Sequence, residues 1–124
     1  MAARLLLIAV AALAWACGPQ QKAREEARAL TGGDPDRGVQ AIGRYGCGAC
    51  HDIPGVQGAN GKVGPPLRGV ASRTYLAGRL TNSPANMATW IQQPQHIERG
   101  TAMPDMGVTP EDARDITAYL YTLR

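Results

Sequence analysis

The run Cys47-Gly-Ala-Cys50-His51 constrains this chain more than any other feature of its 124 residues. Two thiols at this spacing can each add to one vinyl group of the same porphyrin, and the residue that follows then lies under the iron. The His51 imidazole would bind the metal through one nitrogen and leave its other N–H for a hydrogen-bond acceptor. The pattern therefore predicts one covalently attached haem of the c type, held through Cys47 and Cys50.

Other uses of these cysteines fit the sequence less well. A thioredoxin-like redox pair would need a surrounding βαβ pattern, which is missing, and would leave His51 unexplained. A zinc site would need two further ligands, and only Cys17 and His96 remain, without knuckle spacing. A disulfide between Cys47 and Cys50 would close a tight, strained loop. We therefore favour the haem interpretation over all three.

The composition is consistent with a small domain that depends on a cofactor. Residues 34–124 suffice for one domain, at a size where a cofactor often supplements the apolar core. The chain contains no Phe but 15 Gly and 9 Pro, so a buried porphyrin would supply the large apolar body that the side chains lack. The formal net charge of +3 does not indicate a nucleic-acid-binding surface.

Residues 1–16 have the pattern of an export signal. Arg4 gives a short basic start, and the apolar run of residues 5–16 is shorter than the roughly 20 residues needed to span a bilayer. Cys17 follows directly, and two processing patterns remain open. Lipoprotein-type cleavage would leave an acylated Cys17, whereas cleavage after Ala14-Trp15-Ala16 would leave a reactive free thiol. We favour lipidation, which predicts a protein tethered at the periplasmic face of the inner membrane.

Residues 17–33 are predicted to be a lipid anchor and tether. Ala23, Ala27 and Leu30 recur at helical spacing within the charged stretch 20–30, which predicts a short amphipathic helix. Thr31-Gly32-Gly33 then ends it. We expect this helix to be solvated and without a partner.

The domain of residues 34–124 contains two clear helix starts. Asp34 and Thr109 are each followed by a proline, which indicates an N-cap and a first helical position. The first helix should run to Gly46, and the second, with a Thr109–Asp112 capping box, should pack against it. Gly38 and Gly43 are poor helix formers, which predicts a close backbone approach at one of them. Between the helices, residues 52–67 have no periodicity, as expected of a loop that wraps a ligand.

Four marks within residues 34–124 together resemble class I c-type cytochromes. The first is the Cys47-Gly-Ala-Cys50-His51 run, and the second is Gly64-Pro65-Pro66-Leu67. The third is Pro94 followed nine residues later by Met103, and the fourth is the helix end Ala118-Tyr119-Leu120. The resemblance implies an all-α cytochrome c fold of about three to five helices, with long loops around one haem. The segment 75–86 departs from the mitochondrial type and resembles cytochrome c domains fused to, or associated with, some bacterial terminal oxidases.

The resemblance also implies the ligands of the iron. His51 would be the proximal ligand, oriented by the Pro65 carbonyl, and Met103 the sixth ligand. Met106 and Met87 are alternatives that the family spacing disfavours. His96 would give a bis-His site, but it stands where a solvent-facing residue is expected.

Further positions correspond to haem contacts in this family. Trp90 would lie beside the axial methionine or simply fill the core. Arg73 and Thr101 would bind the haem propionates, and Tyr75 and Asn82 are further candidates.

The expected function follows from a haem with both axial positions filled. Such an iron has no open position for a substrate, and the sequence offers no paired carboxylates or nucleophile elsewhere. We therefore expect a one-electron carrier of a respiratory chain with redox partner proteins, and not an enzyme. The alternatives are a subunit or domain of a larger oxidoreductase or terminal oxidase, a haem sensor with a labile Met103, and an assembly protein with a structural haem. Basic residues could form a docking rim or an ordinary solvated surface: Arg44, Lys62, Arg68 and Arg79.

Overall fold

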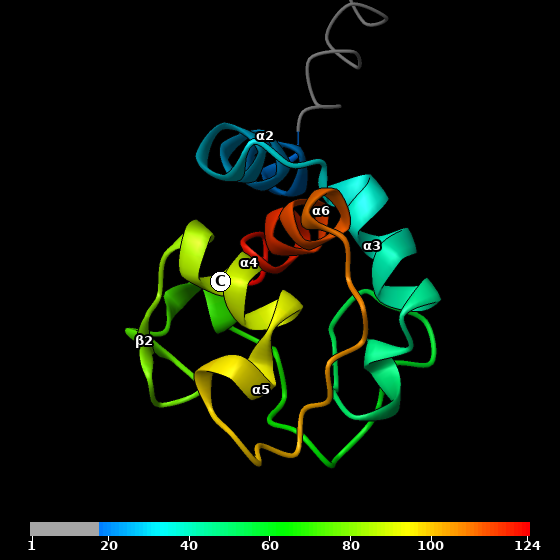
Figure 1. The fold of residues 1–124 in the computed structure, drawn as a ribbon. Coiled ribbons are helices and arrows are strands. Elements are labelled where there is room, and N and C mark those ends of the chain that lie inside the picture. Colours follow the sequence, from blue (N-terminus) through cyan, green and yellow to red (C-terminus); the bar gives the residue numbers. More distant parts are fainter. Residues whose placement is uncertain (1–17) are drawn as a thin grey trace, which may run out of the picture.

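The computed structural model describes residues 18–124, which form five helices and one small hairpin (Figure 1). The helices are α2 (Pro19–Thr31), α3 (Pro35–Arg44), α4 (Pro84–Gln92), α5 (Pro94–Ile97) and α6 (Pro110–Leu120). Two short 3-10 turns cover Cys47–Ala49 and Val70–Ser72. Strands β1 (Tyr75–Leu76) and β2 (Leu80–Thr81) pair antiparallel, with Tyr75 opposite Thr81. The prediction of a mainly helical fold is confirmed, and the hairpin is an addition to it.

The predicted export signal and Cys17 lie outside the described residues. Within residues 18–124, no helix combines the length and the apolar character that crossing a membrane requires.

Both predicted helix starts are present. The Asp34 carboxylate accepts the N–H of Asp36 at 2.7 Å, and the Thr109 hydroxyl accepts the N–H of Asp112 at 3.1 Å. Each cap satisfies one of the backbone donors that a helix N-terminus leaves unpaired. Helix α3 ends at Arg44, shortly before the predicted Gly46, because Gly46 adopts a left-handed φ of 70° that turns the chain out of the helix.

Helices α3 and α6 cross at Gly38. A Cβ atom at Gly38 would lie 2.2 Å from the Asp115 carbonyl oxygen, whereas one at Gly43 would meet nothing within 4 Å. The close approach predicted for one of these two glycines therefore occurs at Gly38. Next to the crossing, the buried Asp115 carboxylate accepts the Asp34 N–H at 2.7 Å and the Arg37 Nε–H at 2.7 Å. The only carboxylate of the buried core thus joins the start of α3 to the middle of α6 within the described chain.

Helix α2 packs against α6, so the expectation of a solvated helix without a partner is wrong. Ala27 is only 1% exposed, while Leu30 of the same predicted apolar stripe is 58% exposed. Arg24 and Arg28 pair with Asp36 at the start of α3, the latter at 2.8 Å, and Glu26 pairs with the C-terminal Arg124 at 2.9 Å. A small residue at the contact and charge pairs around it hold α2 in place. Sequence periodicity does not reveal these charge pairs.

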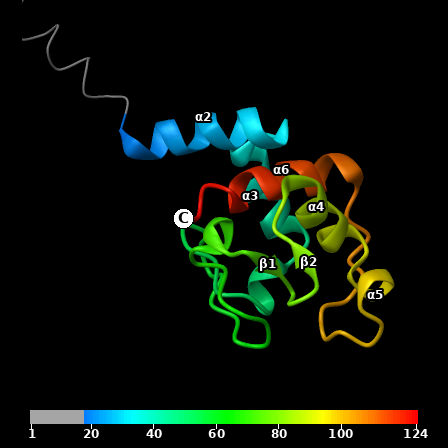
Figure 2. The same cartoon turned by 90° about the vertical axis from the view of Figure 1, so that its left-hand side faces the viewer.

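The remaining elements enclose the core and leave two irregular segments at one end. Helix α4 packs on α6 from the side opposite α3, and the Tyr119 hydroxyl of α6 donates to the Pro54 carbonyl at 2.5 Å. The chain after Cys50 and the chain after α5 both lie at the end of the molecule farthest from α2 (Figures 1 and 2). These two segments carry the predicted ligands His51 and Met103.

Candidate functional site

The residues after α3 form a turn that presents two thiols and an imidazole. Within the 3-10 turn, the N–H groups of Cys50 and His51 both donate to the Cys47 carbonyl, at 3.2 and 3.0 Å. Cys47 and Cys50 form no disulfide with each other, and both are partly buried. Burial raises the pKa of the Cys47 thiol. The local geometry thus holds three groups of the predicted motif on one turn.

The His51 ring is oriented by a backbone carbonyl, as the resemblance implied. Its Nδ1 lies 2.7 Å from the Pro65 oxygen. Because a carbonyl oxygen can only accept, Nδ1 carries the proton and Nε2 keeps its lone pair. Nε2 is therefore the nitrogen that can bind a metal, and the contact with Pro65 fixes the orientation of the ring.

Gly64 lets the loop lie flat against that ring. A Cβ atom at Gly64 would lie 2.4 Å from His51 Cε1 and 2.8 Å from Nδ1, too close for any other residue. The Gly64 N–H in turn donates to the Cys50 carbonyl at 2.7 Å. The loop and the cysteine turn form one cradle around the imidazole, and this cradle requires glycine at position 64.

Met103 lies on the irregular segment between α5 and α6. It is partly buried, whereas Met106 on the same segment is 44% exposed and Met87 is 2% exposed in the core. His96 is exposed, as expected. These environments agree with the preference for Met103, and its role as a ligand stays a prediction.

Sequence reasoning missed Gln95, which holds the Met103 segment. Its side-chain amide donates to the Thr101 carbonyl at 2.6 Å and to the Met103 carbonyl at 2.8 Å. Its own carbonyl oxygen accepts the Gly100 N–H at 3.1 Å. The sequence signal was weak, since it consists of one amide side chain directly after Pro94.

The other predicted haem contacts stand on three different parts of the chain. Trp90 on α4 and Thr101 are partly buried, and the Thr101 N–H donates to the Glu98 carbonyl at 3.1 Å. The Arg73 guanidinium donates to the Pro66 carbonyl, beside the proline that orients His51. The roles of Trp90, Arg73 and Thr101 toward a haem remain predictions.

Asn82 has a different role from the one expected. Its amide nitrogen donates to the carbonyls of Val70 and Arg73 at 2.9 and 2.8 Å, and its oxygen accepts the Tyr121 hydroxyl at 3.0 Å. Both amide hydrogens are therefore already used within the protein, which leaves none for a propionate. The expectation that Asn82 binds a propionate is wrong, and Asn82 instead braces the hairpin. Tyr75 on that hairpin is exposed.

The four basic residues of the expected rim do not form one patch of free charge. Arg44 pairs with Asp112 at 2.8 Å, and Arg79 pairs with Glu98 at 3.0 Å. Lys62 and Arg68 form no ion pair within residues 18–124. Two of the four charges are therefore already matched by carboxylates.

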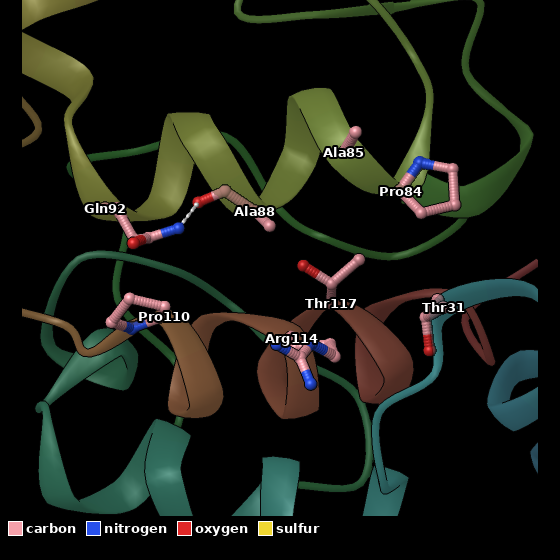
Figure 3. Close-up of a pocket in the computed structure, with 8 residues that line it drawn as sticks. All are labelled: Thr31, Pro84, Ala85, Ala88, Gln92, Pro110, Arg114 and Thr117. Carbon is pink, nitrogen blue, oxygen red and sulfur yellow. Dashed lines mark hydrogen bonds between the residues drawn. The ribbon is translucent and has the colours of Figure 1, made fainter.

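Two surface hollows differ in their relation to this site. One, of about 400 Å³, adjoins the cradle and is lined by Asp52, Asn60, Gly61, Lys62, Gly64 and Pro66. The other, of about 380 Å³, lies between α4 and α6 beside the end of α2. Figure 3 shows Arg114 and Gln92 along this second hollow, and none of the predicted site residues lines it.

The side chains of this site fit an iron held in a porphyrin better than a bare metal ion. No group of three or more His, Cys, Asp or Glu side chains that could hold a bare metal ion occurs in the part of the chain that the structure describes. What the chain offers instead is two cysteines without a disulfide, one imidazole whose Nδ1 faces a carbonyl, and a glycine that lies against the ring. These groups fit a covalently attached haem.

Comparisons with known proteins point the same way. A family model described as "Cytochrome c" matches residues 35–124. The chain is 38% identical to cytochrome c2 of Rhodoblastus acidophilus, across 71% of the chain and 91% of that protein. It is 30% identical to cytochrome c oxidase subunit 2 of Alkalihalophilus pseudofirmus, across 90% of the chain but only 31% of that protein. No solved structure matches the chain.

Proposed function

Because the chain belongs to the cytochrome c family and carries one haem c bound covalently through Cys47 and Cys50, we propose that it is a one-electron carrier of a respiratory chain. In this proposal, His51 and Met103 would both bind the haem iron, and acylated Cys17 would tether the protein at the periplasmic face of the inner membrane. The observation that best supports the ligation is the 2.7 Å contact between His51 Nδ1 and the Pro65 oxygen, since it prepares Nε2 to bind iron.

The protein contributes to electron transfer by holding both ligands and excluding others. When bound, the haem supplies a one-electron redox couple. Pro65 fixes the proton on His51 Nδ1, and Gly64 fixes the plane of the ring. The Met103 thioether is a soft ligand that favours the ferrous state and raises the reduction potential relative to a second histidine. Two protein ligands leave no position for a substrate, which favours outer-sphere transfer over enzymatic turnover.

An optical redox titration with and without carbon monoxide tests this proposal. We expect the purified protein to be low-spin in both oxidation states and to bind carbon monoxide slowly or not at all. Met103→Ala should lose the low-spin His/Met spectrum and bind carbon monoxide promptly, whereas Met106→Ala, a control on the same segment, should behave like the parent. Retention of the spectrum by Met103→Ala would show that another residue is the ligand. Prompt carbon monoxide binding by the parent would favour the sensor alternative instead.

The tether is tested separately by mass spectrometry of the mature N-terminus. A diacylglyceryl group on Cys17 would support it, and an unmodified N-terminus would contradict it. The pattern of residues 1–16 supports export, and it is compatible with haem attachment outside the cytoplasm.

A second candidate function is that of a subunit or redox partner of a terminal oxidase, and it rests on one observation. The match to oxidase subunit 2 covers 90% of the chain, more than residues 35–124 account for, so it extends into the segment before residue 35. Reduced protein should then be reoxidised rapidly by a solubilised terminal oxidase of the same organism. A rate no faster than that of an unrelated c-type cytochrome would leave only the general carrier proposal.

A further inference from the structure

The segment that carries Met103 has no regular secondary structure of its own. From residue 99 to the start of α6 at Pro110, the backbone forms neither helix nor strand, and Gly100 and Gly107 adopt left-handed φ values of 83° and 68°. Such a segment has few backbone hydrogen bonds to keep its shape. The position of a ligand on it must therefore be set by side chains.

Gln95 supplies these side-chain bonds from the helix just before the segment. Its amide nitrogen reaches the carbonyls of Thr101 and Met103, at 2.6 and 2.8 Å, and its amide oxygen accepts the Gly100 N–H at 3.1 Å. Its backbone N–H also lies 3.4 Å from the Asp105 carboxylate. The contacts of this one residue extend over positions 100 to 105, on both sides of Met103.

The hydrogen-bond pattern fixes which way the Gln95 amide points. Two carbonyl oxygens face one end of the amide and one N–H faces the other end. Only the orientation with the NH₂ toward the carbonyls gives each partner a donor or an acceptor. A glutamate of the same shape could accept from Gly100 but could not donate to Thr101 and Met103. Position 95 therefore requires an amide and not merely a side chain of this length.

We propose that Gln95 is the positioning residue for the axial ligand: its amide clamps the backbone on either side of Met103 and keeps the thioether directed at the iron. This inference rests on the proposed function, in which Met103 is the sixth ligand. The clamp acts on the backbone of Met103, so the sulfur can remain bound without any direct contact to Gln95. Loss of the clamp gives the segment alternative shapes and lets the sulfur leave more often.

Matched glutamate variants test the clamp. Gln95→Glu removes both N–H donors, whereas Gln93→Glu makes the same change of charge at an exposed glutamine whose side chain forms no hydrogen bond within residues 18–124. Ferrous Gln95→Glu should bind carbon monoxide on the order of tenfold faster than the parent or more, since two hydrogen bonds are lost. As the pH is raised, the ferric form of Gln95→Glu should lose the absorption band of the bond between sulfur and iron at a lower pH than the ferric parent does. Gln93→Glu should match the parent in both measurements.

A second readout does not depend on the iron. In Gln95→Ala, the Gly100 amide loses its acceptor, and its hydrogen exchange measured by NMR should be at least about tenfold faster than in the parent. Gln93→Ala should leave this rate unchanged. If carbon monoxide binding and Gly100 exchange in the Gln95 variants equal those of the parent, the clamp is refuted.

The Met103→Ala variant separates the two proposals. If Met103→Ala loses the sulfur band while Gln95→Glu keeps it at every pH, Met103 is the ligand and Gln95 does not position it. If Met103→Ala keeps the band, the ligand assignment fails, and the role of Gln95 toward it fails as well.

Discussion

At the scale of single residues, the crossing of α3 and α6 depends on one missing methyl group. The Cβ of any other residue at position 38 would lie only 2.2 Å from the Asp115 carbonyl oxygen. This close approach also brings the Asp115 carboxylate to the Asp34 N–H and the Arg37 guanidinium. Gly38 therefore permits both the packing of the two helices and the pairing of the buried charge beside it.

Two alanine substitutions in the same helix should have opposite effects. Gly38→Ala should lower the free energy of unfolding by about 1–3 kcal/mol, because the new methyl group meets backbone atoms that cannot move aside. Gly43→Ala should raise it by about 0.5–1 kcal/mol, because position 43 faces open space and alanine favours the helix. Chemical denaturation of both variants measures this. Equal effects of the two substitutions would contradict the assigned crossing.

At the scale of elements, a polar contact joins the helix before the cysteines to the helix after Met103. The Tyr45 hydroxyl donates to the Asp112 carboxylate at 2.7 Å, and Arg44 pairs with the same carboxylate at 2.8 Å. The Thr109 N–H lies 3.4 Å from the Tyr45 oxygen. The predicted capping box is therefore only half formed. The Thr109 hydroxyl caps the Asp112 N–H, but the Thr109 N–H faces the Tyr45 oxygen and not the Asp112 carboxylate.

This contact predicts an acid-dependent part of the stability. The Tyr45 hydroxyl, and after it Thr109 and Arg44, hold the pKa of Asp112 below its ordinary value of 3.8. The ionised form is therefore favoured in the folded state, and its contribution is present above pH 3.8 and lost as the pH falls below that value through the folded pKa. Asp112→Asn should lower the melting temperature at neutral pH, and the difference from the parent should shrink below pH 3.8.

Melting curves followed by circular dichroism at several pH values check this expectation. Glu111→Gln is the matched control, since Glu111 stands in the same first turn of α6 and forms no hydrogen bond within the described residues. A constant difference between Asp112→Asn and the parent down to pH 2 would rule out the assigned linkage.

Whether the sequence predicts a contact depends on how far apart its two residues stand in the chain. Caps such as Asp34 and Thr109 are local, because donor and acceptor stand within three residues, and the sequence shows them directly. The haem motif is local for the same reason. Tyr45 and Asp112 stand 67 positions apart, and no periodicity connects them.

Polar side chains that bond to backbone carbonyls are also invisible in the sequence. The side-chain amides of Gln95 and Asn82 both form such bonds. The sequence does not show whether an amide side chain faces solvent or is fully hydrogen-bonded within the protein. For Asn82, the family resemblance suggested a haem contact, yet both of its N–H groups donate to the carbonyls of Val70 and Arg73. Helix propensity singled out Gly38 and Gly43, but it could not tell at which of them the second helix approaches.

At the scale of the whole molecule, α2 is a part of the folded unit and not a free linker. It lies across α6, at the end of the molecule farthest from the segments that carry His51 and Met103 (Figures 1 and 2). An anchor at Cys17, as proposed, would therefore hold the protein by that end and leave the ligand-bearing segments facing away from it. A docked α2 would restrict how the domain turns relative to the membrane, whereas a flexible linker would not.

A charge placed at the contact of α2 should release the helix. Ala27 is 1% exposed in the helix that packs on α6, so Ala27→Glu would bury an unpaired carboxylate and should lower the free energy of unfolding by about 1–3 kcal/mol. Ala29→Glu makes the same change on the exposed side of α2 and should have little effect. Trypsin provides a direct measure of docking, because Lys22, Arg24 and Arg28 all lie in α2, and the two arginines are paired with Asp36 while the helix is docked. Cleavage at these sites should be faster in Ala27→Glu than in Ala29→Glu, and equal rates in the two variants would mean that α2 is not docked in solution.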